Sequence, residues 1–264
     1  MTEPAVLVEQ RDHTLLVTIN RPGAANSINA AVHRGLGEAW ERADADAGVR
    51  AVVLTGAGDG AFCGGADLEA LGTTGPDGVT PPETAHWGFA GVVKHHIRKP
   101  VIAAVNGTAL GGGTELALAS DLVVASDGAE FGLPEVHRGL IAGAGGVFRI
   151  GQAIPRAVAM ELILTGKPMT AQDALRWGLV NRVVPQADVL STALALAEDV
   201  AAGAPLAVQA SKTVARGIVD GTVAAEAHAW ELTDRALARL TTSADTLEGV
   251  MAFMQKRAPV WKGE

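Results

Sequence analysis

The stretch "NGTALGGGTELALASD", residues 106–121, places three consecutive glycines before an apolar segment that holds a single glutamate, Glu115. Glycines let the backbone turn tightly or approach another group closely, because no Cβ stands in the way. The apolar residues that follow predict a helix whose first turn carries Glu115. The ordinary role of such a glutamate is to stabilise the helix dipole, by about 1 kcal/mol at most. A carboxylate among buried neighbours costs free energy unless it is paired or used, so Glu115 is a candidate catalytic residue.

Short β-branched runs surround this stretch. Each is closed by glycine, asparagine or serine, as is typical of strands. A helix is expected between the second and third runs, because Leu36, Ala39, Trp40 and Ala43 recur at helical spacing. Strands interleaved with helices predict an α/β layer fold. The expected strands are residues 5–10, 14–20, 50–56, 100–107 and 121–126.

The strand pattern fades after about residue 155, and helices are expected in its place. Residues 72–83, rich in proline and glycine, are expected to form a mobile surface loop. We therefore predict a mixed α/β core over residues 1–200 and a helical region over residues 201–264. The expected C-terminal helices are residues 188–203, 205–219, 222–240 and 243–257.

The composition indicates a globular protein that does not bind nucleic acid. Of the 264 residues, 48% are hydrophobic and 19% charged, and the formal net charge is −8. Nucleic-acid binding requires clustered cations, and the sequence contains no strongly basic stretch. The first residues do not resemble a signal peptide, and no apolar run approaches the roughly 18 residues of a membrane span. A single cysteine, Cys63, cannot form an internal disulfide, so a cytoplasmic protein is expected.

Three further patterns are weak signals of chemistry. Residues 56–61 fit the dinucleotide-binding pattern G-x-G-x-x-A, but the chain continues into "FCGGAD" instead of opening a helix. Cys63 is expected to be a packing residue, because no partner base is visible near it. His95 and His96 are expected to lie in a solvated basic segment, "KHHIRK", because neighbouring helical side chains point apart and suit a metal ion poorly. No metal site is expected.

Four segments together resemble the crotonase family, which includes enoyl-CoA hydratases and isomerases. They are "FCGGADL" (62–68), "RKPVIAAVNGTALGGGTELALASDLVVAS" (98–126), "AEFGLPEVHRGLIAGAGG" (129–146) and "LTGKPMTAQDALRWGLVNRVVP" (164–185). The closing "TLEGVMAFMQKRAPVWKG" (246–263) looks most like the carnitinyl-CoA dehydratase branch of that family. The resemblance runs from about Leu15 to the C-terminus. It implies a spiral of ββα repeats with a C-terminal helical oligomerisation region, assembled as a homotrimer or hexamer.

The resemblance also implies a chemical role for four residues. Family members hold the carbonyl oxygen of a CoA thioester between two backbone N–H groups, and the matching residues are Gly64 and Gly112. Two preorganised donors stabilise the enolate-like charge that forms there. Glu115 and Glu135 match the two catalytic glutamates, and we expect Glu115 to be the base that orients water and Glu135 to be the acid. A chain that keeps both is expected to be a hydratase.

Coenzyme A is part of the substrate, so no separate cofactor is expected. The cations at residues 256 and 257 lie in a segment that in relatives reaches a neighbouring subunit's ligand, although a solvated helix end is an equal alternative. Gly23 replaces a lysine common in the family, which removes one possible contact to CoA. The implied substrate contacts are Ala24, Ala66, Asp67, Leu68, Gly143, Lys256 and Arg257.

The expected activity is reversible hydration of a trans-2-enoyl-CoA. A carnitinyl-CoA dehydratase, an enoyl-CoA isomerase and a non-catalytic acyl-CoA-binding protein remain alternatives. A quaternary ammonium substrate needs an aromatic face or a carboxylate nearby. The chain contains no tyrosine, which leaves residues such as Trp87 or Phe89 as candidate faces.

Overall fold

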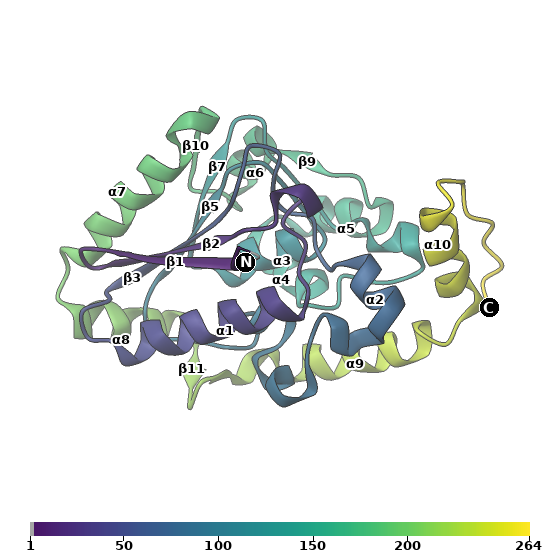
Figure 1. The fold of residues 1–264 in the computed structure, drawn as a ribbon, viewed down its shortest axis with the longest axis horizontal. Helices are drawn as coiled ribbons and strands as arrows, with labels where there is room; N and C mark the ends of the chain where they lie inside the picture. The colour runs from purple at the N-terminus through teal and green to yellow at the C-terminus, as the bar shows by residue number, and fades with distance from the viewer. Residues whose placement is uncertain (1–2) are drawn as a thin grey trace.

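Pairs of strands followed by a helix repeat along the first part of the chain, in a computed structural model that describes residues 3–264. The first strand of each pair joins one sheet and the second strand joins another, so the chain winds as a spiral (Figure 1). This confirms the predicted α/β architecture of ββα repeats. The three repeats are β3 (Ala51–Gly56), β4 (Ala61–Cys63) and α2 (Leu68–Thr74); β5 (Val101–Val105), β6 (Thr108–Leu110) and α3 (Gly112–Ala119); and β7 (Leu122–Ser126), β8 (Glu130–Gly132) and α4 (Gly146–Ala153).

The larger sheet has six strands in the order β1-β2-β3-β5-β7-β10. Its first two strands, β1 (Val6–Arg11) and β2 (Thr14–Ile19), form an antiparallel pair, and the others run parallel. The smaller sheet has the order β4-β6-β8-β9, and β9 (Met169–Thr170) is antiparallel to β8. Because β4, β6 and β8 are parallel, their carboxyl ends lie together at one edge, directly before the segments that carry the candidate residues.

Helices cover both faces of the larger sheet. On one face, α1 (Ala30–Ala45) buries the apolar stripe that the sequence predicted, including Leu36 and Trp40. On the other face, α7 (Val189–Ala201) buries Ala193 and Ala197 against sheet residues such as Val53. Figure 1 shows α1 and α7 on opposite sides of the strands. Strands covered on both faces require nearly continuous apolar sequence, which β3 and β5 have.

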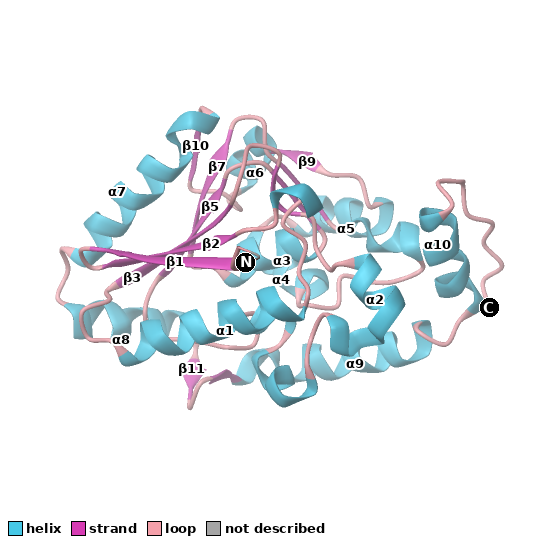
Figure 2. Ribbon diagram, in the orientation of Figure 1, coloured by secondary structure: helices cyan, strands magenta, loops and turns pink. Residues whose placement is uncertain are grey.

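The rest of the chain is mostly helical, as Figure 2 shows. The segments α5 (Arg156–Thr165), α6 (Ala171–Trp177) and the edge strand β10 (Arg182–Val184) precede α7. Three helices follow α7, namely α8 (Pro205–Arg216), α9 (Ala227–Leu240) and α10 (Ala244–Met254). No single helix within residues 3–264 is long and apolar enough to cross a membrane; α7 and α8, bent by 105°, pass that test only as a pair.

The predicted helices at 205–219 and 222–240 are wrong where they meet. A hairpin of β11 (Ile218–Val219) and β12 (Thr222–Val223) lies between α8 and α9. Asp220 and Gly221 form its turn with φ values of 49° and 73°. Asp-Gly favours such two-residue turns, because both positions adopt the left-handed conformation.

Three other expectations also differ from the structure. Strands β9 and β10 lie beyond residue 155, but they are too short to give a strand pattern in the sequence. Residues 72–83 hold the end of α2 and two 3-10 turns, Gly75–Gly78 and the start of Pro82–Trp87. The "KHHIRK" segment is not wholly solvated, because Lys99 is buried and donates to Val49 O at 2.8 Å.

Candidate active site

Glu115 lies in the first turn of α3, directly behind the glycine turn. Its side chain is 3% exposed, and its Oε1 accepts the N–H of Gly146 at 2.8 Å. Gly146 is the first residue of α4, so the N-terminus of that helix faces the carboxyl group. The sequence correctly predicted Glu115 as a buried acid at a helix start.

The start of α3 is held by a hydroxyl and by the glycine turn. The Thr114 hydroxyl lies 2.7 Å from Ala109 O and accepts the N–H of Gly132 at 2.9 Å. Gly111 has a φ of 55°, a left-handed conformation that favours glycine, and donates to Gly132 O at 2.8 Å. These bonds join α3 to β6 and β8 and fix the direction of Glu115.

Glu135 lies in the short 3-10 helix η5 (Pro134–Arg138), which follows β8. A Cβ built on Gly111 would lie 2.8 Å from Glu135 Oε1, so the carboxyl group packs against the glycine turn. Glu135 Oε2 is buried and has no hydrogen-bond partner within residues 3–264. An unpartnered buried oxygen of this kind is free to bind a ligand atom or water.

The two glutamates form an electrostatically linked pair. Burial, and then the charge of Glu135, raises the pKa of Glu115 to about 8. Burial raises the pKa of Glu135 to about 7. Because two close buried carboxylates resist ionising together, the pair retains one proton near neutral pH. The site therefore holds a carboxylate and a carboxylic acid at the same time.

The expectation for Gly64 as a donor to a thioester oxygen needs correction. Its N–H donates to Ala25 O at 2.9 Å and is not free. The N–H of Ala66 has no acceptor in the described part of the chain. A Cβ on Gly65 would lie 3.2 Å from Gly112 N, which places Gly65, the residue before Ala66, beside Gly112. The Gly112 N–H opens α3, where the first N–H groups have no intrahelical acceptor.

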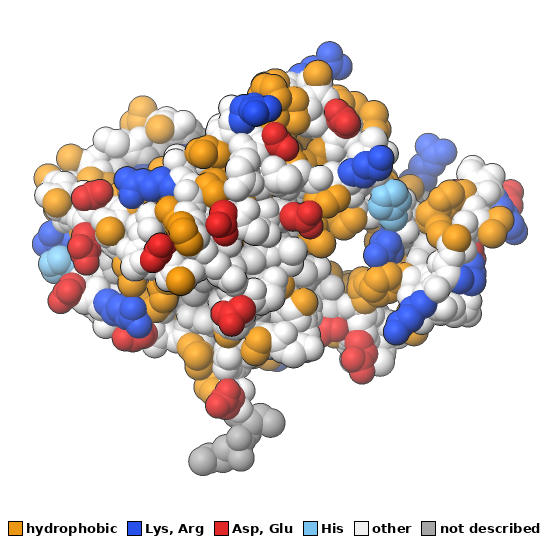
Figure 3. Space-filling model, turned by 90° about the horizontal axis from the view of Figure 1, so that it is seen from above, with side chains coloured by type: hydrophobic (Ala, Val, Ile, Leu, Met, Phe, Trp, Pro, Cys, Tyr) orange, Lys and Arg blue, Asp and Glu red, His pale blue; other side chains and the backbone are white. Residues whose placement is uncertain are grey.

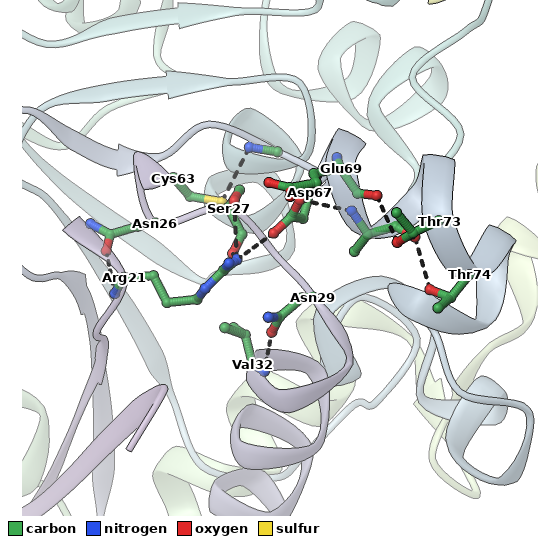
Figure 4. Close-up of polar contacts among 12 residues, drawn as sticks. Arg21, Asn26, Ser27, Asn29, Val32, Cys63, Asp67, Glu69, Thr73 and Thr74 are labelled. Atoms are coloured by element: carbon green, nitrogen blue, oxygen red, sulfur yellow. Dashed lines mark hydrogen bonds and ion pairs between the residues drawn. The ribbon is translucent and has the colours of Figure 1, made fainter. Parts of the chain in front are cut away.

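The other residues expected to contact substrate lie around this point. Ala24 ends the 3-10 turn Pro22–Ala24, which packs next to Gly64 through Ala25. The Asp67 carboxylate forms an ion pair with Arg21 at 2.8 Å (Figure 4). It also caps the N-terminus of α2, whose first residue is Leu68. The carboxylate of Asp67 therefore has a structural role, and its backbone N–H donates to Ile28 O at 2.9 Å.

The C-terminal helices close over the site within the same chain. Gly143 packs on Leu237 of α9, since a Cβ there would lie 2.6 Å from Leu237 Cδ1. Gly139, which follows η5, accepts a hydrogen bond from the Thr246 hydroxyl of α10 at 2.7 Å. Figure 3 shows the molecule hollowed between its main body and these helices, with Lys and Arg side chains around the hollow.

Lys256 and Arg257 are exposed at the end of α10. Arg257 is paired with Glu248, and its Nη2 lies 2.8 Å from Glu248 Oε2. Neither cation lines the cavity described next. Their role toward CoA phosphates and the assembly into trimers or hexamers stay predictions.

A cavity of about 240 Å³ lies between residues 88–94, the loop before α4 and Trp230. Phe89 forms one wall, and a Cβ on Gly112 would lie 2.4 Å from its ring. Trp230 of α9 forms another wall, and Lys94 Nζ lies 4.2 Å from the centre of its ring. Of the two aromatic residues that the sequence suggested, Phe89 lines the cavity, whereas Trp87 stacks on His95 away from it.

Sequence reasoning did not identify Trp230, and it placed Lys94 in the "KHHIRK" segment expected to be solvated. A buried ion pair holds Trp230 in place: Arg149 of α4 donates to Glu226 at 2.7 Å, and the Trp230 indole donates to Glu226 at 3.3 Å. Arg149 also donates to Val93 O at 2.9 Å. This pair ties α9 to α4, whose first residue binds Glu115.

The competing motifs are packing features. Cys63 is buried, and burial raises the pKa of its thiol to about 12, so the thiol is a poor nucleophile. The glycine pattern at 56–61 joins β3 to β4 and opens no helix. Both observations agree with the expectations from sequence.

The chain was then compared with known proteins. Residues 9–264 match the family model described as enoyl-CoA hydratase/isomerase. The chain is 40% identical to a carnitinyl-CoA dehydratase of Proteus mirabilis over 96% of each chain, and 41% identical to one of Escherichia coli K12 over 94% and 95%.

Solved structures resemble the chain over its whole length. A carnitinyl-CoA hydratase from Mycobacterium avium is 58% identical, with a TM-score of 0.97 over 100% of both chains. An enoyl-CoA hydratase from Mycobacterium tuberculosis is 46% identical, with a TM-score of 0.76 over 99% of this chain and 100% of that one. The chain therefore belongs to the enoyl-CoA hydratase/isomerase family, the crotonase family.

Proposed function

We propose that the protein adds water reversibly to the double bond of a 2-enoyl-CoA thioester. The observation that carries this proposal is the pair Glu115 and Glu135 beside one glycine turn, in which Glu115 is buried and Glu135 is half-buried with a buried Oε2 atom. Hydration needs a base and an acid in one site, and a pair that shares one proton supplies both.

The thioester oxygen is placed between the N–H groups of Ala66 and Gly112. Neither N–H has an acceptor within residues 3–264, and Gly65, the neighbour of Ala66 in the chain, packs against Gly112. Charge that develops on the oxygen during attack is stabilised by these fixed donors and by the N-terminus of α3. Ala66 thus takes the role that the sequence had assigned to Gly64.

The reaction follows from these positions. Water loses a proton to Glu115 while its oxygen bonds to the β-carbon, and the electrons of the double bond move toward the thioester oxygen. The α-carbon then takes the proton of Glu135, and the thioester carbonyl is restored. In the ligand-free site the higher pKa is that of Glu115. Hydration starts only when Glu115 is ionised and Glu135 is protonated, so the shared proton has to move from Glu115 to Glu135 before water attacks.

Dehydration of a carnitinyl-CoA is the second candidate, and the names of the relatives favour it. Its chemistry is the same reaction run in reverse on an acyl chain that bears a trimethylammonium group. Both candidates use the same two glutamates, so they differ in the acyl chain that the cavity lined by Phe89 and Trp230, called the acyl cavity below, accepts.

Labelled water tests the proposal. We expect crotonyl-CoA incubated with the protein in H₂¹⁸O to give 3-hydroxybutyryl-CoA that carries one ¹⁸O atom, as measured by mass spectrometry. An isomerase would move the double bond without taking up label, and a binding protein would leave the thioester unchanged. Absence of ¹⁸O from every enoyl-CoA tested, including crotonobetainyl-CoA, would refute the hydro-lyase assignment.

A further inference from the structure

The acyl cavity carries a cation on one wall. Lys94 is the one ionisable side chain among the residues that line it within the described chain. Its Nζ lies over the Trp230 ring, 4.2 Å from the ring centre, so the indole face is already occupied by an ammonium group. Lys94 is half-buried. Its backbone N–H donates to Trp87 O at 2.9 Å, which fixes the position of the Cα atom from which the side chain extends.

The neighbouring charges do not cancel this cation. Glu226 lies behind Trp230, but it is paired with Arg149 through two hydrogen bonds of 3.0 and 2.7 Å. Arg149 itself lies 5.4 Å from the Trp230 ring centre. Two cations and one carboxylate therefore surround the indole, and the excess charge there is positive.

The cavity lies next to the segments that hold the catalytic pair. Ala144 lines it, and Gly146, two residues further along the same loop, binds Glu115. Phe89 lines it on the other side and contacts Gly112, a proposed donor to the thioester oxygen. A thioester bound at Gly112 and reacting at Glu115 would extend its acyl chain toward Lys94.

We propose that Lys94, held on Trp230, is a specificity-determining residue that admits acyl chains ending in a carboxylate and rejects those ending in a quaternary ammonium. The inference rests on the proposed function for the direction of the acyl chain. A carboxylate at the end of a short chain pairs with the ammonium of Lys94. A trimethylammonium group would have to displace Lys94 from the indole and remain beside it, against the repulsion of like charges. The substrate class is then the 2-enoyl-CoA of a dicarboxylic acid, unlike that in the relatives' names.

Saturated thioesters test this inference without turnover. We would measure the dissociation constants of glutaryl-CoA, butyryl-CoA and γ-butyrobetainyl-CoA, which carry an anionic, a neutral and a cationic chain end, by isothermal titration calorimetry. The wild-type protein should bind glutaryl-CoA at least about tenfold more tightly than γ-butyrobetainyl-CoA, an estimate from one close charge interaction. Equal binding, or tighter binding of the cationic thioester, would overturn the inference.

Three variants identify Lys94 as the cause. Lys94→Met keeps the length of the side chain and removes its charge, so the preference for glutaryl-CoA should vanish while butyryl-CoA binding changes less than about threefold. Lys94→Arg keeps the charge and should retain the preference. Lys167→Met, a change at an exposed lysine outside the cavity, is the matched control. A preference that persists in Lys94→Met would assign the selectivity to another group.

The two proposals fail separately. These thioesters have no double bond and cannot be hydrated, so their binding ratios are obtained whether or not the protein takes up ¹⁸O. Uptake of ¹⁸O with preferred binding of the cationic chain would keep the hydro-lyase function and refute the role of Lys94.

Discussion

Replacing Glu115 by Gln should abolish hydration and make the protein more stable at alkaline pH. Gln keeps an oxygen that can accept the N–H of Gly146 but cannot ionise. In the wild-type protein, burial and the charge of Glu135 raise the pKa of Glu115 from 4.5 to about 8. At about 1.4 kcal/mol per unit of pKa, full ionisation of the buried group costs on the order of 5 kcal/mol.

The sign follows from where the proton is lost. The unfolded chain releases it near the ordinary pKa of 4.5 and the folded protein only near 8, so unfolding releases a proton between these values. The stability of the wild type relative to Glu115→Gln is therefore highest below pH 4.5 and falls as the pH rises through 8. Between about pH 5 and pH 8 the expected fall is on the order of 3 kcal/mol.

Urea unfolding at both pH values measures this difference. Wild type, Glu115→Gln and the exposed control Glu161→Gln are compared at one protein concentration, because assembly would shift apparent stability. Glu161→Gln should follow the wild type at both pH values. A stability difference between wild type and Glu115→Gln that does not change with pH would show that Glu115 is not the perturbed group.

Other perturbations probe the rest of the site. Gly146→Ala would put a methyl group 2.9 Å from Glu115 Oε1. Steady-state kinetics should then show kcat reduced by about 10²-fold, with an unchanged far-UV circular dichroism spectrum, and an unchanged kcat would contradict this. Gly65→Ala, at a φ of 93°, would place a methyl group 3.2 Å from Gly112 N, and we expect kcat to fall by about 10²-fold or more. A variant in which only KM rises would argue against a thioester-oxygen site at Gly112. Arg149→Met leaves Glu226 buried and unpaired, which should lower the free energy of unfolding by about 3–5 kcal/mol in urea titrations; a loss below about 1 kcal/mol would show that the pair does not hold α9. The rate of hydration should have its optimum near pH 7 to 8, where the glutamate pair holds one proton, and a rate that is flat from about pH 5 to 10 would be inconsistent with a shared proton.

The parts of the site that sequence could predict are local in the chain. Glu115 stands out because a glycine turn and an apolar helix surround it within ten residues on either side. Its link to Gly146 and the approach of Glu135 to Gly111 depend on how β6, β8 and α4 meet. The resemblance to the family supplied Glu135, and its own surroundings, rich in turns, would have suggested a surface glutamate.

The parts that sequence could not predict depend on contacts between distant segments. The carbonyl of Ala25 accepts the Gly64 N–H, so Gly64 cannot donate to a thioester oxygen. The Ala66 N–H has no acceptor within residues 3–264. Lys94 and Trp230 are far apart in the sequence and meet where the Arg149–Glu226 ion pair joins the start of α9 to α4. The hairpin at residues 218–223, by contrast, had a readable Asp-Gly signal within a stretch whose composition favours helix.

The most direct test of the glutamate pair is the rate of hydration of a 2-enoyl-CoA by three single variants. Loss of the absorbance of the conjugated thioester is followed for wild type, Glu115→Gln, Glu135→Gln and the control Glu161→Gln. The account predicts that each of the first two variants lowers kcat by about 10²- to 10⁴-fold, while the control retains the wild-type rate. A full rate in either Glu115→Gln or Glu135→Gln would contradict a mechanism in which both carboxyl groups transfer protons.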